Sequence, residues 1–568
     1  MIQYVRRTTA GLGLAATLML MGNGALMGQG TPDDLTQGKA WWSHVEYLAS
    51  DAMQGRQTGS AEYLKAAAYV VEKFQSYGLK PAEINGGWYQ PVKFTVQRIL
   101  ADQSSLTLVS GCKSCPSFNE APLKLGEDAV LGTRQPQPKA VDAQLVFVGY
   151  GLHLPEASYD DFNSAELPAA SLKGKILVYM NGGPAELPGA LNSYARTAPF
   201  LKAAREAGAV GLISVPTPKS MDFGWQRVAS SASQPGMRLA PRPDDDLVAR
   251  RHPALADDHA PIFTATFNPA QAEKLFASTG RTFAQLLALA DAQKPLPRFE
   301  LRKSLRATVV TETTEVESPN IVGKLEGSDP ALKSEYVLVS AHLDHLGVGA
   351  LIHGKTIYAG AMDDASGVAT VLETARYFDK MSRSGKERPK RSILFLIFTA
   401  EEKGLLGSRY FAGHPTIPEK EIVADLNLDM FMPIFPLKKL HVQGLEQSTL
   451  AEDAKVVGAA HAIEIAGDPE PDRNSFIRTD QYSFVQAGVP ALAMKFGWIA
   501  GSPEYKAWRS WLAERYHSTD DDLTQPVDLE AAAQFNRFFC DLALHVADDP
   551  ARPHYLPSSF FHRFEIPQ

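Results

Sequence analysis

Two continuous apolar runs separated by an amphipathic segment constrain the fold of this chain more than any other feature. The runs span Tyr336 to Ala341 and Ile393 to Phe398, and each is typical of a parallel strand buried on both faces. Between them, apolar residues recur at helical spacing: Val368, Val371, Leu372, Ala375 and Phe378. A strand, a helix and a second strand form a βαβ unit. We therefore expect a three-layer α/β/α domain with a mixed, mainly parallel sheet.

Changes in composition along the chain predict its division into domains. A Pro- and Gln-rich stretch, residues 132–140, marks a boundary, and short β-rich runs bounded by glycine follow it. We expect a main domain formed by residues 31–135 and 306–568, interrupted by a smaller, β-rich αβ module at residues 136–305. Within this module, the Pro- and Asp-rich residues 235–259 predict a long loop.

Residues 1–29 predict an export signal. Arg6 and Arg7 supply a short positive region, and an uncharged, mostly apolar run follows from Ala10 to Met21. The 12 residues of this run are too few to cross a bilayer, which takes about 20. No cysteine lies near the small residues of the cleavage zone, so we expect no lipid anchor. The alternative is an uncleaved apolar helix; with cleavage, the mature protein is periplasmic or secreted.

The charge balance argues against a nucleic-acid partner. The chain has 56 Lys and Arg against 64 Asp and Glu, a net charge of −8, and it lacks basic blocks. Its three cysteines cannot form a disulfide scaffold. We interpret Cys112 and Cys115 as a small surface disulfide rather than a zinc knuckle or a redox motif, and Cys540 as a buried free thiol. The sequence carries no prediction of oligomeric state.

Polar side chains of the kinds that bind metals follow three of the expected strands. His342 and Asp344 follow the first run, Glu401 and Glu402 follow the second, and Asp429 follows a third at Ala424 to Leu428. In an open α/β sheet, ligands bind outside the carboxyl ends of the strands. Carboxylates that converge there repel one another unless a divalent cation neutralises them. A set of His, Asp and Glu suits zinc, although manganese or cobalt would accept the same ligands.

Asp363 and Asp364 stand directly before the expected helix, where one of them is placed to be shared between two metals. Each of these features has an ordinary interpretation when taken alone. A His-x-Asp pair is often structural, a Glu-Glu pair is often a solvated turn, and two aspartates are often a helix cap. Their common position at strand ends favours a metal centre.

The motifs that contain these residues resemble the co-catalytic zinc exopeptidases of the aminopeptidase-Y and bacterial leucyl aminopeptidase type. They are Ser340 to Gly347 (SAHLDHLG), Gly360 to Gly367 (GAMDDASG), Thr399 to Ser408 (TAEEKGLLGS), Asn427 to Met430 (NLDM) and the pair Tyr516-His517. Residues 48–60 resemble the same family, and the inserted module resembles a protease-associated (PA) domain. The resemblance thus extends over most of residues 40–525.

This resemblance implies two zinc ions per subunit. One would be bound by His342, Asp363 and Asp429, and the other by Glu402 and His517, with Asp363 as the bridge between them. Without the resemblance, His517 would be read as a surface histidine in an acidic turn, because it is one of 14 histidines in the chain.

The resemblance also implies the catalytic roles. Glu401 looks like the general base that takes a proton from a metal-bound water, so that the resulting hydroxide attacks the carbonyl of the N-terminal peptide bond. Asp344 would hold His342 in the correct tautomer. The substrates would then be peptides, cleaved by an exported aminopeptidase.

One segment departs from the family pattern. Phe476 stands at the position where a tyrosine would be the oxyanion donor, and Gln481 replaces the usual histidine. Arg478 or Tyr482 is then the candidate for an oxyanion or substrate contact.

Three alternatives to an aminopeptidase fit the residues to different degrees. A carboxypeptidase or another amidohydrolase on the same di-zinc scaffold is the main alternative, since Arg478 would suit a substrate carboxylate. A binding protein built on an inactive peptidase is less favoured, because all the matched ligands and the base are present. A serine hydrolase is not supported, because Ser366 lacks the Gly-x-Ser-x-Gly context of a nucleophile.

Overall fold

The computed structural model describes residues 32–565, apart from residues 112, 113, 115, 117, 165, 166, 188, 222, 233, 278 and 471–474. The expected export signal at residues 1–29 and the pair Cys112 and Cys115 lie outside the described residues. Cys540 is a buried free cysteine, which confirms that prediction. Among the helices of the described part, none combines the length and the apolar character that a membrane span requires.

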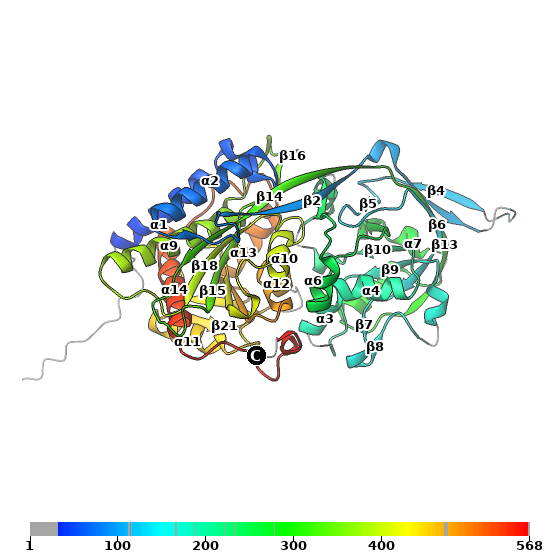
Figure 1. The fold of residues 1–568 in the computed structure, drawn as a ribbon. Coiled ribbons are helices and arrows are strands. Elements are labelled where there is room, and N and C mark those ends of the chain that lie inside the picture. The colour runs from blue at the N-terminus through cyan, green and yellow to red at the C-terminus, as the bar shows by residue number, and fades with distance from the viewer. Residues whose placement is uncertain are drawn as a thin grey trace, which may run out of the picture.

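The main domain is built on a mixed sheet whose centre is parallel (Figure 1). Its strands lie in the order β11 (Gly236–Leu239), β2 (Tyr89–Ile99), β14 (Thr311–Leu325), β18 (Ser392–Phe398), β15 (Tyr336–His342), β19 (Ile422–Asn427), β22 (Ala491–Phe496), β20 (Lys439–Gln443) and β21 (Glu464–Ala466), and β1 (Lys80–Pro81) pairs with β14. Strands β18, β15, β19 and β22 are parallel to one another. The flanking pairs are antiparallel, apart from β20 with β21.

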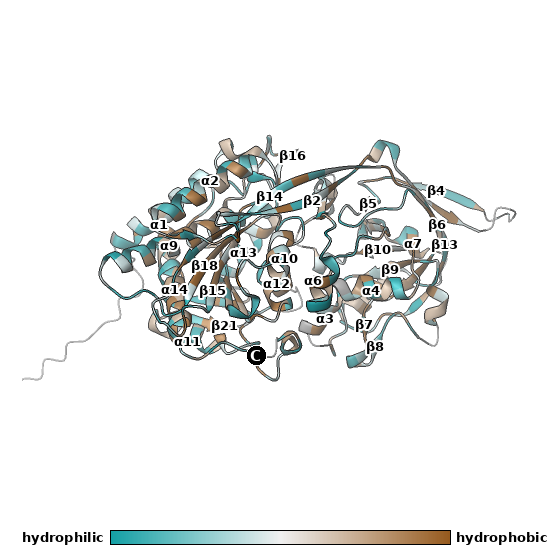
Figure 2. Cartoon of the chain, in the orientation of Figure 1, coloured by the Kyte–Doolittle hydropathy of each residue, from teal (hydrophilic) through white to brown (hydrophobic). Residues whose placement is uncertain are grey.

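Helices cover both faces of this sheet, so the predicted three-layer fold is confirmed. Alternate side chains of β15 enter different cores, with Val337 and Val339 on one face and Leu338 on the other. The first face is covered by α1 (Pro32–Leu48), α2 (Ala61–Ser76), α9 (Ser366–Arg383), α11 (Leu450–Ala460) and α14 (Leu529–Asp548). The second face is covered by α10 (Leu406–Gly413) and α12 (Gln481–Gln486). Burial on both faces explains why β15 and β18 are continuous apolar runs, which Figure 2 shows in brown.

A second sheet with its own core lies beside the main domain. Its strands lie in the order β4 (Asn119–Leu123), β3 (Ser105–Ser110), β13 (Arg298–Thr308), β6 (Ala140–Val148), β9 (Ile176–Met180), β10 (Gly211–Val215), β12 (Phe263–Phe267) and β5 (Ala129–Leu131). Its helices include α3 (Gly189–Ala195), α4 (Ala198–Glu206), α5 (Trp225–Ala232), α7 (Glu273–Phe276) and α8 (Phe283–Asp291). The long strands β2 and β14 extend from the main domain toward this sheet (Figure 1).

The structure differs from the expected division at two places. Strands β3, β4 and β5 belong to the second sheet, although we expected residues 31–135 to lie in the main domain; β3 pairs with β13, so the boundary lies near residue 100. Residues 235–259 are not the long loop that we expected. They contain β11, which extends the main sheet by pairing with β2, and helix α6 (Asp245–Arg251).

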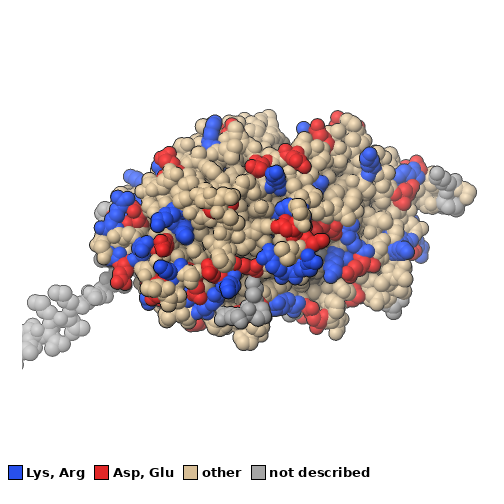
Figure 3. Space-filling view, in the orientation of Figure 1, with Lys and Arg blue, Asp and Glu red and all other residues tan. Residues whose placement is uncertain are grey.

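The residues on either side of α6 also contact the main domain directly. His252, which follows α6, lies 2.5 Å from Glu419. Asp244, which precedes α6, accepts a hydrogen bond from His414 at 3.0 Å. On the face shown in Figure 3, basic and acidic side chains are interspersed over both lobes.

Candidate metal centre

Three parallel strands bring the candidate ligands to one edge of the main sheet. His342 is the last residue of β15, Glu401 and Glu402 follow β18, and Asp429 follows β19. Because β15 is parallel to both neighbours, these carboxyl ends meet, as the sequence predicted. The fifth residue, Asp363, lies in the turn before α9, which crosses from β15 to β18.

The first group of ligand atoms surrounds one oxygen of Asp363. His342 Nε2 lies 3.2 Å from Asp363 Oδ1 and 3.9 Å from Asp429 Oδ1. All three side chains are buried. Because their ligand atoms lie within 4.8 Å of one another, a single ion could be bound by all three.

The second group surrounds the other oxygen of Asp363. His517 Nε2 lies 3.3 Å from Asp363 Oδ2 and 3.1 Å from Glu402 Oε2. His345, which the sequence motif contained but to which we gave no role, belongs here as well. Its Nδ1 lies 2.7 Å from Glu402 Oε1 and 4.0 Å from Asp363 Oδ2. Asp363 thus lies between the two groups with one oxygen toward each.

The chemistry of these residues fits divalent metal ions. Several buried atoms make no hydrogen bond among the described residues, which is costly for polar atoms away from water. These atoms are His342 Nε2, His345 Nδ1 and Nε2, Glu402 Oε1 and Asp429 Oδ1. Imidazole and carboxylate donors at this spacing suit zinc, and cobalt or manganese would accept them.

Asp344 contacts His342 through its main chain and the segment of Glu401 through its carboxylate. We expected Asp344 to orient the His342 ring. Its main-chain carbonyl oxygen lies 3.0 Å from His342 Nδ1, whereas its carboxylate lies 4.0 Å from the same nitrogen. The carboxylate accepts a hydrogen bond from the main-chain N–H of Glu401 at 3.1 Å and another from Thr58 Oγ1 at 3.0 Å. Asp344 therefore positions both His342 and the segment that contains Glu401.

Two further aspartates fix the turn that contains Asp363. Asp521 accepts hydrogen bonds from the main-chain N–H groups of Met362 at 2.9 Å and Asp363 at 3.1 Å. Asp364 Oδ1 accepts from the N–H groups of Gly367 at 2.9 Å and Met430 at 3.2 Å. Asp364 thus binds the main chain of its own turn and of Met430, whereas Asp363 is the aspartate whose two oxygens lie near His342 and His517.

The neighbouring residues Glu401 and Glu402 have pKa values shifted in opposite directions. Burial raises the pKa of Glu401 well above its usual range, and the carboxylates of Glu402 and Asp429 add to this effect. Burial also opposes ionisation of Glu402, but His517 and His345 outweigh it and hold the Glu402 pKa well below its usual range. Opposite shifts of this kind are typical of a proton-transfer group beside a permanently charged one.

Arg478 and Tyr482, the candidate oxyanion or substrate contacts, occupy different surroundings. Tyr482 lies in an apolar cluster with Val485, Tyr555 and Phe561, so its assignment to the site is wrong. Arg478 Nη2 donates a hydrogen bond to the hydroxyl oxygen of Tyr516 at 3.3 Å. The ring centroid of Tyr516 lies 4.0 Å from that of His517.

Tyr516 is a second residue that the sequence motif contained and to which we gave no role of its own. Burial raises the pKa of its hydroxyl well above its usual range. The positive charge of Arg478 opposes this rise in pKa, and the negative charges of Asp363, Glu402 and Asp429 add to it. The hydroxyl therefore stays protonated and can donate a hydrogen bond.

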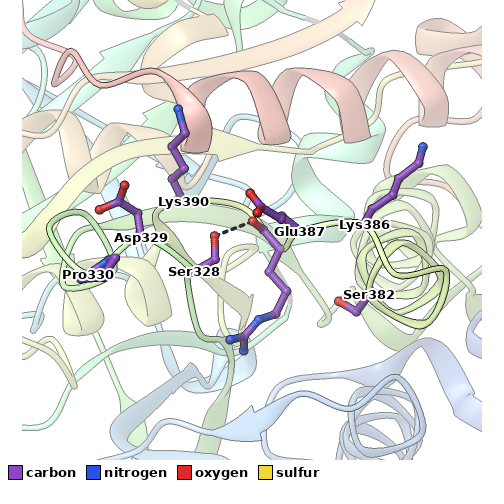
Figure 4. A pocket seen from close by; sticks show the side chains of 8 residues that line it. Ser328, Asp329, Pro330, Ser382, Lys386, Glu387 and Lys390 are labelled. Atoms are coloured by element: carbon purple, nitrogen blue, oxygen red, sulfur yellow. Dashed lines mark hydrogen bonds between the residues drawn. The ribbon is translucent and has the colours of Figure 1, made fainter.

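A hollow of about 490 Å³ lies elsewhere on the molecule (Figure 4). It is lined by Ser328, Lys386 and Lys390, among others, and Ser328 Oγ donates a hydrogen bond to the carbonyl oxygen of Arg388. Lys390 precedes β18, whereas the metal-binding groups follow it. The hollow is thus at the opposite edge of the sheet from the candidate centre.

Comparison with known proteins confirms the family resemblance found in the motifs. Residues 320–543 match the family model described as Peptidase family M28. The chain is 26% identical over 370 residues to Aminopeptidase NAALADL1 of Rattus norvegicus, which covers 59% of this chain and 45% of that protein. It is 24% identical over 481 residues to Probable glutamate carboxypeptidase AMP1 of Arabidopsis thaliana, covering 79% of this chain and 61% of that protein. The chain thus spans about half the length of these curated relatives.

A solved structure with a similar fold is an aminopeptidase from Aneurinibacillus sp. strain AM-1. It aligns with a TM-score of 0.50 at 19% sequence identity, over 91% of this chain and 96% of that chain. At this identity the likeness concerns the fold, which it shares across both lobes.

Proposed function

Since residues 320–543 match the model of peptidase family M28, we propose that this chain is an exported aminopeptidase. It would use two zinc ions to remove N-terminal residues from peptides. The observation that carries the proposal is the pair of adjoining ligand groups that share Asp363, with Glu401 next to them. Export follows from residues 1–29 of the sequence alone.

The residues divide into ligands and a proton carrier. His342, Asp363 and Asp429 would hold one ion, and Asp363, Glu402 and His517 the other. When bound, zinc supplies a Lewis acid that polarises the substrate carbonyl and lowers the pKa of water.

Glu401 is placed to move the proton. Its Oε2 lies 4.0 Å from His342 Nε2, close to the first group but outside the three ligands of that group. It takes a proton from the attacking water and returns it to the amine of the leaving peptide. A carboxylate with a raised pKa suits this role, because it must both accept and release a proton near neutral pH.

Tyr516 is placed to stabilise the oxyanion. Its hydroxyl accepts a hydrogen bond from Arg478, which leaves the hydroxyl proton free to point elsewhere. A neutral hydroxyl donor close to the centre would strengthen its hydrogen bond as negative charge develops on the substrate oxygen. We therefore assign to Tyr516 the role that the sequence offered to Arg478 or Tyr482, with Arg478 orienting it.

Replacement of Tyr516 by Phe tests this assignment. We expect kcat to fall on the order of 100-fold with little change in KM, since removing one oxyanion donor costs about 10²–10³ in rate. The zinc content should stay at the wild-type value. Steady-state kinetics with an aminoacyl anilide, together with elemental analysis, measure both quantities; an unchanged kcat would exclude Tyr516 as the donor.

The inserted module, to which Phe223 and Arg227 belong, borders the candidate metal centre and would narrow the access of substrates to it. The ring centroid of Phe223 lies 6.0 Å from that of Tyr516 and 6.1 Å from that of His517. Arg227 Nη1 donates a hydrogen bond to the main-chain oxygen of Tyr516 at 2.7 Å. We propose that this PA-like module selects substrates by shape at the entrance.

A panel of blocked and free substrates tests the reaction class. An aminopeptidase should cleave an aminoacyl anilide and lose this activity when the α-amine is acetylated, whereas a carboxypeptidase should cleave an N-blocked dipeptide. Addition of a chelator should abolish the activity in either case, and added zinc should restore it.

Carboxypeptidase action is the second candidate, favoured by the position of Arg478 beside Tyr516 and by the named activity of the Arabidopsis relative.

A further inference from the structure

His345 is fully buried next to the second ligand group, yet nothing in the described part of the chain uses its ring nitrogens in a hydrogen bond. Its Nδ1 faces Glu402 Oε1 at 2.7 Å and Asp363 Oδ2 at 4.0 Å. The ring centroid of His345 lies 5.9 Å from that of His517. His345, Asp363 and Glu402 offer ligand atoms that lie within 4.8 Å of one another, and His517 lies on the other side of Glu402 and Asp363. The four side chains come from the loop after β15, the turn before α9, the loop after β18 and the loop that contains Tyr516.

The backbone around His345 holds its ring in this position. The guanidinium of Arg56, which is buried, donates hydrogen bonds to the carbonyl oxygens of Leu343 at 2.8 Å and Gly360 at 3.0 Å. A Cβ at Gly360 would lie 2.5 Å from Cγ of His345, so the ring packs directly on the Gly360 backbone. Only a glycine at 360 leaves room for this packing. The ring therefore cannot swing away from Glu402 without disturbing the segment between Tyr358 and Asp363.

We propose that His345 is a fourth protein ligand of the second metal position, beside Asp363, Glu402 and His517. The first position, with His342, Asp363 and Asp429, has three protein ligands. Zinc sites with four protein ligands are closed and structural, whereas catalytic zinc sites have three and keep one position open. The two positions are therefore unequal: the second is closed, and the first is the one open to water and substrate.

The donor set of the second position supports this assignment. It contains two imidazoles and two carboxylates, whereas the first position contains one imidazole and two carboxylates. Imidazole favours zinc or cobalt over manganese and magnesium. We expect the second position to bind zinc more tightly than the first and to select more strongly against manganese. This inference rests on the proposed metal centre and is independent of which peptide end is cleaved.

The variant His345→Gln, loaded with Co²⁺, tests the assignment. The wild-type protein should bind two Co²⁺ ions with two affinities, and the tighter site should give the intense visible absorption of tetrahedral cobalt. In His345→Gln, we expect the affinity of that site to fall at least about ten-fold and its absorption to weaken, while the other site keeps its affinity. The matched control is His353→Gln, because His353 is 72% exposed in the turn between β16 (Gly347–Ile352) and β17 (Lys355–Tyr358).

Two outcomes would overturn the assignment. An unchanged cobalt spectrum and affinity would exclude His345 from the centre, and a weaker affinity with an unchanged spectrum would mean that His345 only orients Glu402. If His345→Gln does not fold by circular dichroism, His345→Cys replaces it: a thiolate ligand adds a sulfur-to-cobalt charge-transfer band, and a cysteine outside the coordination sphere adds none. Wild-type protein that binds no cobalt would refute the metal centre itself, whereas lack of peptidase activity with two bound ions would refute only the proposed function.

Discussion

Replacement of Glu401 by Gln should reduce turnover about 10²–10⁴-fold and leave the metal content unchanged, because a general base contributes about this much to the rate. The amide keeps the size of the carboxylate but cannot accept the proton of the attacking water. Glu401 lies outside the ligand sets that we assign to both metal positions, so its loss should not release an ion. Turnover of an aminoacyl anilide and elemental analysis of the same preparation measure the two quantities.

The matched control for this variant is Glu312→Gln, which makes the same chemical change at an exposed position on β14. It should keep wild-type turnover and metal content. If Glu401→Gln retained turnover comparable to that of this control, Glu401 could not be the base. If it lost one ion, Glu401 would have to be a ligand.

Replacement of Asp363 by Asn should weaken both metal positions and abolish activity. Asp363 Oδ1 faces His342 and Oδ2 faces His517, so an amide removes a charged oxygen from at least one group and the shared negative charge from both. We expect the affinity for each ion to fall at least about 100-fold, more than the 10–100-fold cost of losing a supporting residue. Turnover should fall by on the order of 10³ or more, since metal polarisation contributes several kcal/mol to transition-state stabilisation.

Competition with a chelator of known affinity measures each binding constant, and thermal unfolding shows whether the variant is folded. The control is Asp142→Asn on β6, where the side chain is 59% exposed and pairs with Arg306 at the surface. Such a surface pair contributes at most about 1 kcal/mol, so this control should bind both ions normally. Loss of a single ion from Asp363→Asn, with the other bound at wild-type affinity, would show that Asp363 is not the bridge.

The convergence of His342, Glu401, Glu402 and Asp429 could be predicted because local pattern determines it. Each follows an apolar run that can only be a buried parallel strand, and parallel strands end at a common edge. Asp363 could be placed there too, since the crossing helix must begin at that edge. These contacts depend on the parallel direction of the strands, which the amphipathic helix between the first two runs predicts.

Other features of the centre depend on contacts between distant segments. His517 lies beyond the last of these strands, so only its resemblance to a family motif singled it out. Tyr482 was assigned to the site because it lies four residues after Arg478 in the sequence. In the structure it packs against Tyr555 and Phe561. The boundary near residue 100 was missed because the pairing of β3 with β13 joins segments nearly 200 residues apart, and no local composition change marks it.

The layered α/β domain, the edge at which the ligands meet and the match of residues 320–543 to the peptidase family M28 model all follow from the amino-acid sequence. The tertiary structure alone decided that His345 lies against Glu402, that Tyr516 receives the hydrogen bond of Arg478, and that the carbonyl rather than the carboxylate of Asp344 orients His342. The physical reason is the range of the interactions. Periodicity reports which face of an element is buried, whereas the direction of a side chain within a loop is set by packing and hydrogen bonds from segments remote in sequence.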